Sequence, residues 1–304
     1  MLVVSCSINY LATMARMATN QSNTISEDAF LQRMRNYVAP NPSPRNPRVS
    51  TQSSHADRIE AGYKADGHTV WGFVIYRTTY ESDADWDEFM RRLRLWTSKE
   101  MDFYNGRDVL ERMAWTVVED RERFEGADAA AVRSHFREWA EANFATEQRQ
   151  TSQVSGGGGE QPSSITMGQY SRYRYCVQVD ADALRSAVHE SSPPPAFDKD
   201  NQGWVKVVDK DWTPRGESQT SSSAMMDSNT YELVDGVTEY DVGWVKCPFP
   251  SVMTEYYMLF RDLNGYTVAY RRPPLTSVIM QGRLAIPHVF RIGTARESFR
   301  TWVG

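Results

Sequence analysis

Aromatic, cationic and acidic side chains at the ends of predicted strands are the first candidates for chemistry in this sequence. Arg77, Arg271 and Arg272 each end an apolar run, and guanidinium groups on neighbouring strands would suit an anionic or aromatic ligand, or an interface. We favour the alternative that these arginines form ordinary ion pairs with helix carboxylates. The residues that we predict to bind a ligand or a partner are Trp71, Tyr76, Arg77, Asp241, Trp244, Tyr270 and Arg271.

Pairs of acidic residues follow three of the predicted strands. These pairs are Glu119 with Asp120, Asp180 with Asp182, and Asp209 with Asp211. Carboxylates that converge at one edge of a sheet could hold Mg²⁺. We favour the alternative that they occupy turns and helix caps, where Asp is common. We therefore predict no metal site and no cofactor.

The other reactive residue types show no spacing that indicates a catalytic site. No two histidines fall on one helix face, and Cys6, Cys176 and Cys247 are too far apart for a clustered metal site. Tyr170–Tyr175 alternates aromatic and basic residues, as platforms for single-stranded nucleic acid do. The formal charge of the chain is -5, however, so we do not favour nucleic acid as a partner.

The segment Thr69–Trp96 predicts a β-α unit around which the other elements are organised. Val70–Tyr76 is apolar on both faces, which is typical of a strand covered on both sides. Ser82 is placed to cap a following helix, and an apolar stripe recurs at helical spacing after it. The stripe consists of Trp86, Phe89, Met90, Leu93 and Trp96.

Alternation and helical periodicity predict further elements along the chain. We expect strands at 113–119, 173–180, 203–209, 240–247 and 266–271, and helices at 27–37, 128–144, 181–190 and 252–262. Two near-repeats accompany these strands. The sequence Gly-Trp-Val-Lys at 203–206 recurs at 243–246, and Val-Ile-Tyr-Arg at 74–77 is echoed at 268–271. One interpretation is a duplicated β-α-β unit. The other is that the matches arise by chance, because apolar strands are built from few residue types.

Composition sets further bounds on the protein class. Hydrophobic residues make up 40% of the 304 residues, and the deficit lies in polar tracts, so the remainder can form a normal core. No apolar run approaches the roughly 18 residues of a membrane span, so we expect a soluble protein without a membrane partner. Three scattered cysteines favour a reducing compartment, and we predict a cytoplasmic location.

The order and character of several segments resemble those of a family of uncharacterised proteins of filamentous ascomycete fungi. The resemblance covers about residues 69 to 274. The segments are WGFVIYRTTYESDADWDEFM, MAWTVVEDRERFEGADAAAVRSHFREW, YRYCVQVDADALRSAV, YDVGWVKCP and YTVAYRRPP. The resemblance implies a fungal intracellular protein, and it implies no activity because none is established for the family.

We predict an α+β fold with a mixed or antiparallel sheet built from β-α-β units, with two ferredoxin-like halves as one option, and helices packed on the sheet. Residues 1–67 are predicted to be a largely disordered, Pro-rich region with one short helix. Residues 68–274 form the α+β domain, and residues 275–304 are left unassigned. Flexible insertions are expected at 145–168, 191–202 and 213–229.

We predict the first of two classes of function and keep the second as the alternative. The first is a non-enzymatic protein that binds a small molecule or a protein partner. The second is a small-molecule enzyme, such as a cofactor-free cyclase or isomerase, with Asp241 or Glu119 as acid or base in an aromatic-lined pocket. An interior pocket with a desolvated carboxylate would favour the enzyme. A filled core with an exposed aromatic patch would favour the binding protein.

Overall fold

Five strands form one mixed sheet in the computed structural model. The structure describes residues 43–45, 53–66, 68, 70–152, 171–196, 198, 201–214, 231–262 and 264–278. The strands are β1 (Val74–Arg77), β2 (Val117–Val118), β3 (Tyr175–Val179), β4 (Trp204–Asp209) and β5 (Trp244–Pro248), and their order in the sheet is β2-β1-β3-β4-β5. Strands β2, β1 and β3 run parallel to one another. Strand β4 runs antiparallel to both of its neighbours, β3 and β5. The predicted α+β fold with a mixed sheet is confirmed, whereas two ferredoxin-like halves are not found among the described residues.

Helices connect and cover the strands. The longer ones are α3 (His55–Asp66), α4 (Asp83–Phe103) and α7 (Ala129–Ser152). The short helical segments are α5 (Arg107–Leu110), α6 (Arg121–Phe124), α8 (Ser171–Arg174), α9 (Ala181–Arg185), η2 (Ser186–Glu190), η4 (Phe249–Ser251), η5 (Val252–Tyr256), α10 (Tyr257–Leu259) and α11 (Gly265–Ala269). None of the described helices is long and apolar enough to cross a membrane.

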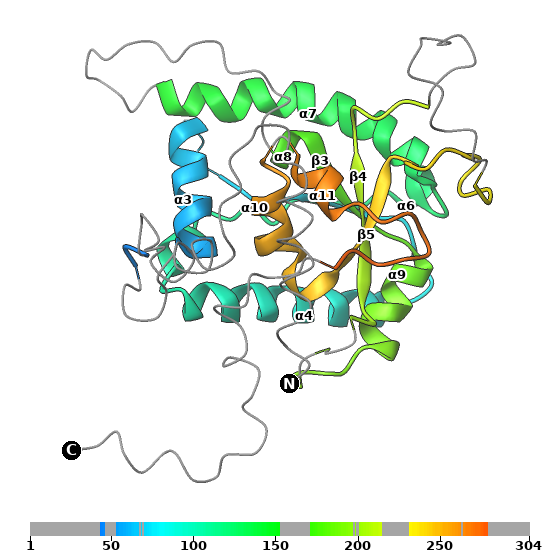
Figure 1. Cartoon of the computed structure of the whole chain (residues 1–304), viewed down its shortest axis with the longest axis horizontal. Helices are drawn as coiled ribbons and strands as arrows, with labels where there is room; N and C mark the ends of the chain where they lie inside the picture. The colour runs from blue at the N-terminus through cyan, green and yellow to red at the C-terminus, as the bar shows by residue number, and fades with distance from the viewer. Residues whose placement is uncertain are drawn as a thin grey trace, which may run out of the picture. The chain divides into compact units, whose positions relative to one another are not determined.

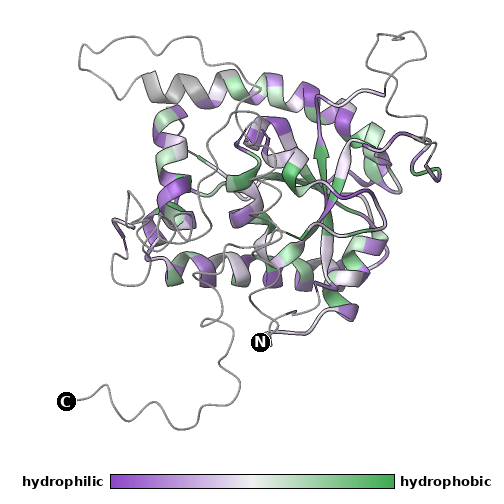
Figure 2. Cartoon of the chain, viewed as in Figure 1, coloured by the Kyte–Doolittle hydropathy of each residue, from purple (hydrophilic) through white to green (hydrophobic). Residues whose placement is uncertain are grey.

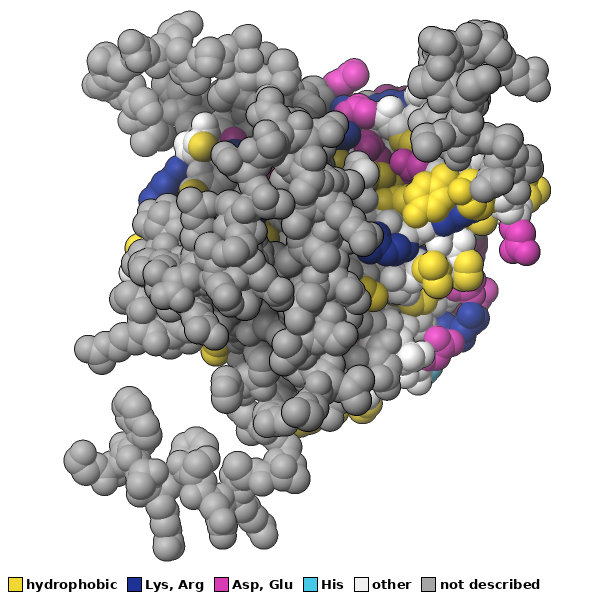
Figure 3. Space-filling model, viewed as in Figure 1, with side chains coloured by type: hydrophobic (Ala, Val, Ile, Leu, Met, Phe, Trp, Pro, Cys, Tyr) yellow, Lys and Arg dark blue, Asp and Glu magenta, His cyan; other side chains and the backbone are white. Residues whose placement is uncertain are grey.

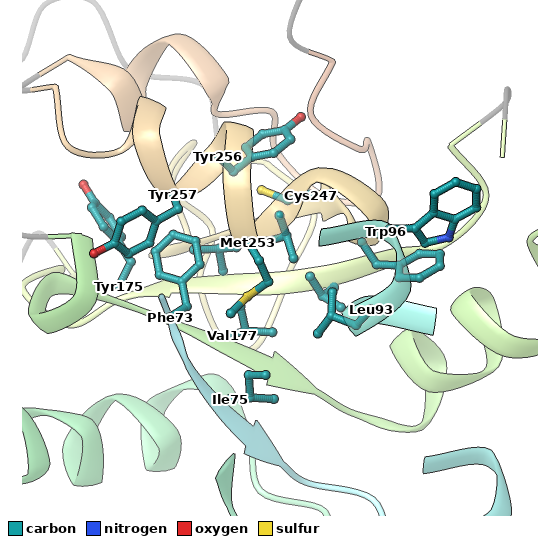
Figure 4. Packing of buried hydrophobic residues seen from close by; sticks show 14 of the residues in the cluster. Phe73, Ile75, Leu93, Trp96, Tyr175, Val177, Cys247, Met253, Tyr256 and Tyr257 are labelled. Carbon is teal, nitrogen blue, oxygen red and sulfur yellow. The ribbon is translucent and has the colours of Figure 1, made fainter. Parts of the chain in front are cut away.

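The sheet is covered on both faces, as the apolar β1 segment predicts. Phe73 and Ile75 pack in the larger core cluster with α4, α3 and α10, whereas Val74 and Tyr76 pack on the other face with α6 and α7. Figure 1 shows α4 and α7 on opposite sides of the strands, and Figure 2 shows hydrophobic residues concentrated on the strands while both helices also carry hydrophilic ones. In Figure 4, side chains from β1, β3, β5, α4 and η5 point toward one another and fill the larger core.

The β-α unit forms as predicted. The Ser82 side chain accepts a hydrogen bond from the Asp85 backbone N–H at 3.1 Å and so caps the start of α4. The predicted apolar stripe of α4 is buried. The helices predicted at 181–190 and 252–262 are also confirmed, each with a π-helical turn, at η2 and η5.

The strands predicted at 113–119 and 240–247 are limited to Val117–Val118 and Trp244–Pro248, and two predictions about helices are also wrong. The helix at 128–144 continues as α7 to Ser152, so it occupies the first part of the insertion predicted at 145–168. The polar region up to residue 67 was predicted to be largely disordered, yet 55–66 form α3, whose Ala56, Ile59 and Tyr63 are buried in the core. The predicted helix at 27–37 lies outside the described residues.

The strand predicted at 266–271 is a helix instead. Residues Gly265–Ala269 form α11, and the ring of Tyr266 on this helix lies 5.6 Å from that of Tyr270, which directly follows it. Tyr266 also stacks on Tyr175 of β3 with 5.6 Å between ring centroids, so packing against the sheet outweighs the strand preference of an aromatic and β-branched sequence. Likewise, Ser171–Arg174 form a helical turn with Arg172 and Tyr173 buried, so the predicted aromatic and basic strand begins only at Tyr175.

Candidate ligand site on strands β4 and β5

The Gly-Trp-Val-Lys near-repeat forms a symmetric arrangement on the two antiparallel strands. Lys206 of β4 lies directly opposite Lys246 of β5, so both side chains are on the same face of the sheet. The Lys206 ammonium lies 4.4 Å from the ring centroid of Trp244, and the Lys246 ammonium lies 3.7 Å from that of Trp204. Each lysine therefore covers the tryptophan of the neighbouring strand.

The two lysines differ in how their charge is balanced. Lys206 Nζ lies 2.8 Å from Asp180 Oδ2, a carboxylate that also caps α9. Lys246 makes no ion pair with a described carboxylate, and its main chain is held by β4 and by Ser277, whose N–H donates to the Lys246 carbonyl at 2.7 Å. Both lysines are half-buried. Lys246 therefore lies beside an aromatic ring without a direct ion pair to a carboxylate of the described residues.

The electrostatics of Lys246 follow from this placement. Burial lowers the pKa of the Lys246 amine, and the Lys206 ammonium lowers it further, while Asp180, Asp182 and Glu190 act in the opposite direction. Like charges directly opposite each other on a sheet are destabilising. An anion that lies between the two ammonium groups would relieve this repulsion.

The two glycines of the near-repeat are required by their surroundings for different reasons. Gly203 leaves room for Phe249, because a Cβ on Gly203 would lie 2.6 Å from the Phe249 ring. Gly243 has a φ of +78°, and a Cβ there would lie 2.4 Å from both Arg133 and Trp212. The glycines therefore fix the start of each strand and the position of each following tryptophan.

Gly243→Ala is expected to lower the free energy of unfolding by about 2 kcal/mol, because it adds a close contact to an unfavourable backbone conformation. Gly236→Ala is the matched control, since Gly236 has a φ of +81° but nothing within 4 Å of an added Cβ. We expect Gly236→Ala to lower the free energy of unfolding by only about half as much, since backbone strain alone costs about 1 kcal/mol. Urea denaturation of both variants measures the difference, and equal losses would contradict the packing role of Gly243.

Three of the predicted binding residues, Trp71, Tyr76 and Arg77, have side chains that are held by different partners and do not form one site. Trp71 is fully buried and donates its Nε1–H to the Val109 carbonyl at 2.6 Å, while the Tyr76 hydroxyl lies 2.8 Å from His135 Nδ1 on the opposite face. Arg77 pairs with Asp83 at the start of α4 and lies over the rings of Tyr80 and Trp86. For Arg77, the alternative of an ordinary ion pair with a helix carboxylate therefore holds.

Three others do come together at the start of β5. Asp241 Oδ1 accepts hydrogen bonds from the Gly243 N–H at 2.8 Å and the Tyr266 hydroxyl at 3.3 Å. The Tyr270 hydroxyl donates to the Tyr240 carbonyl at 2.6 Å. Trp244 donates its Nε1–H to Asp235 at 2.8 Å.

The last predicted binding residue, Arg271, is exposed and donates to the Val268 and Tyr270 carbonyls. It does not end a strand, because 265–269 are helical. The expected group of strand-end arginines beside Arg77 is therefore wrong.

The acidic pairs occupy caps and turns, as the favoured alternative predicts. Asp120 caps α6 and Asp180 caps α9, while Asp209 accepts a hydrogen bond from the Asp211 N–H at 2.9 Å. Asp180 follows the end of β3. Because β4 runs antiparallel to β3, Asp209 at the end of β4 lies opposite Tyr175, at the start of β3. Within the described ranges, no group of three or more potential ligands could hold a metal ion.

A small cavity of about 20 Å³ lies between α3 and α10. It is lined by aromatic and charged side chains that include Tyr63, Asp66, His68, Trp71, Tyr257 and Arg261. Burial raises the pKa of the Asp66 carboxyl, although Asp66 pairs with Arg261. A cavity of this size holds about one water molecule, whereas pockets for organic ligands measure roughly 300 to 1,000 Å³.

Sequence reasoning missed Lys206 and Lys246, the two cations of the site. The signal was present in the near-repeat, since two Trp-x-Lys segments can face each other when they pair in antiparallel register.

No protein-family model, curated protein or solved structure matches this chain.

Proposed function

We propose that the protein binds a planar, anionic small molecule on the β4–β5 face formed by Trp204, Lys206, Trp244 and Lys246. The carrying observation is the Lys246 ammonium, which is half-buried over Trp204 and lacks an ion pair with any described carboxylate. A planar ligand would take the place of the Lys246 ammonium over the Trp204 ring, and its anionic group would pair with that ammonium. Aromatic stacking and charge together would select such a ligand over a neutral or an aliphatic one.

The filled core supports binding over catalysis. Glu119 accepts a hydrogen bond from the Trp86 Nε1–H at 2.9 Å, and Asp241 is engaged by Gly243 and Tyr266, so neither proposed acid or base faces a described cavity of substrate size. A small-molecule enzyme with these residues would need such a cavity.

A protein partner is the second candidate. Large apolar side chains are exposed on segments 231–240 and 265–278, and Figure 3 shows hydrophobic side chains gathered beside basic ones on the visible described surface. These exposed side chains are Leu233, Tyr240, Val268, Leu275 and Val278. Apolar groups of this kind are common at interaction surfaces.

The binding proposal is tested with 2-naphthoate as a planar anion, followed by tryptophan fluorescence and calorimetry. Lys246→Gln and Trp204→Leu are each expected to weaken binding at least about tenfold, which corresponds to about 1.4 kcal/mol. Lys99→Gln is the matched control, because the Lys99 ammonium lies 4.6 Å from the Trp96 ring without a second lysine opposite it.

Two comparison ligands complete the test, one neutral and planar and one anionic and aliphatic. Neutral 2-naphthamide and aliphatic hexanoate should each bind more weakly than 2-naphthoate, because each lacks one of the two recognised features. Equal affinity of 2-naphthamide and 2-naphthoate, or unchanged binding by Lys246→Gln, would rule out the proposed site.

A further inference from the structure

We infer that the Lys246 amine is a nucleophile that forms an imine with a planar, anionic aldehyde bound against Trp204. The inference rests on the proposed function, because the same face must first hold the ligand. It goes further by assigning a covalent step to one atom, Lys246 Nζ. The substrate class is an aromatic or conjugated aldehyde that carries a carboxylate or a phosphate.

Lys246 is set apart from the other described lysines by its surroundings. Lys64 pairs with Glu60, Lys206 with Asp180, and Lys210 with Asp211. Lys99 lies over Trp96, but on helix α4 and without a cation directly opposite. Lys246 alone among these combines the absence of a carboxylate partner, an aromatic neighbour and an ammonium group directly across the strand pair.

Burial and the Lys206 ammonium favour the neutral, nucleophilic form of the amine, whereas the contact with the Trp204 ring favours the ammonium form. A lysine becomes reactive when it is desolvated or lies next to another cation, because both effects disfavour protonation. Both are present at Lys246, where burial and Lys206 lower the pKa while Asp180, Asp182 and Glu190 oppose the shift. The Asp180 carboxylate is itself occupied by Lys206 at 2.8 Å, which limits its effect on Lys246.

Imine formation needs only the amine and the aldehyde, and it releases one molecule of water. The Nζ lone pair forms a bond to the carbonyl carbon, and the C=O π electrons move to oxygen. A proton moves from nitrogen to that oxygen, and the carbinolamine then loses water as the C=N bond forms. The Lys206 ammonium, on the same face, stabilises the developing negative charge on oxygen. Nothing is oxidised or reduced, and hydrolysis reverses the step.

The strand scaffold suits such a step because it fixes the amine. Lys246 is paired with β4 on one side and with residues 276–277 on the other. Sites on strands hold reacting groups more accurately than sites on loops. The aldehyde would therefore meet the amine in a defined orientation, with its ring on Trp204.

The test treats the full chain with 4-carboxybenzaldehyde at pH 8 in the presence of cyanoborohydride, which traps an imine as a stable amine. Peptide mapping by mass spectrometry then gives the rate at each lysine. We expect Lys246 to be modified at least about tenfold faster than Lys64, which pairs with Glu60, or Lys99, which has no second ammonium opposite it. Lys206→Gln should slow modification of Lys246, because it removes the neighbouring charge.

Lys246→Arg separates the covalent step from binding, because it keeps the cation and removes the nucleophile. We expect this variant to bind 2-naphthoate and to lose the fast adduct, whereas Lys99→Arg should keep both. Binding of 2-naphthoate with modification spread evenly over exposed lysines would overturn the imine step and leave the proposed function intact. Absence of both binding and a fast adduct would overturn both proposals.

Discussion

Arg172→Ala is expected to lower the free energy of unfolding by about 3 to 5 kcal/mol, the largest effect that we anticipate for a single substitution outside the ligand site. The Arg172 side chain is 1% exposed and donates to the Gly72 carbonyl at 2.8 Å and the Thr116 hydroxyl at 3.0 Å. It also forms a two-pronged ion pair with Glu147 and lies over the Trp139 ring. Alanine would leave the Gly72 carbonyl, the Thr116 hydroxyl and the Glu147 carboxylate without this hydrogen-bond donor.

Urea denaturation of the purified variant measures the loss. Arg121→Ala is the control for removal of an arginine, since Arg121 forms an exposed pair with Glu125 and should contribute little. Arg172→Lys should fall between wild type and Arg172→Ala, because it keeps the charge but cannot form the planar fork. A loss below about 1 kcal/mol for Arg172→Ala would show that surrounding groups find other partners.

The fold was predictable where the signals are local. The β1–α4 unit is specified by an apolar run, the Ser82 cap and a helical stripe, all within one stretch of chain. Helix α3 was missed because its apolar residues are few and lie in a polar region. Its burial depends on Tyr257 and Met258, which are distant in sequence.

The candidate site could not be predicted because it depends on strand register. Residues Lys206 and Lys246 are 40 positions apart, and only the antiparallel pairing of β4 with β5 places them opposite each other. Tyr266 and Tyr270 illustrate a related ambiguity. A spacing of four residues fits one face of a strand as well as one face of a helix, and packing on Tyr175 is satisfied by the helix.

Acidification is expected to destabilise the protein through His68. The His68 ring is buried and lies edge-on to Tyr173, with 5.4 Å between the ring centroids. Burial lowers the pKa of His68 from its ordinary value of 6.5 to about 4, and the Arg172 and Arg261 guanidinium groups act in the same direction. The unfolded chain therefore takes up a proton near pH 6.5, whereas the folded protein resists it until about pH 4.

The sign of the effect follows from this difference in proton uptake. The contribution of neutral His68 is fully present above pH 6.5, and it is lost progressively as the pH falls toward 4. The expected loss is about 3 kcal/mol across this window. Urea denaturation at a series of pH values in the wild type and in His68→Gln measures it as the difference between the two pH profiles.

That difference isolates His68, because the carboxylates that titrate in the same window are common to both proteins. His189→Gln, which removes an exposed histidine, is the control for the loss of a histidine outside the core. Parallel profiles for wild type and His68→Gln would mean that the folded protein accommodates a charged His68. In that case a rearrangement of the cavity between α3 and α10, where His68 lies with Asp66 and Arg261, would have to admit water or a counter-ion.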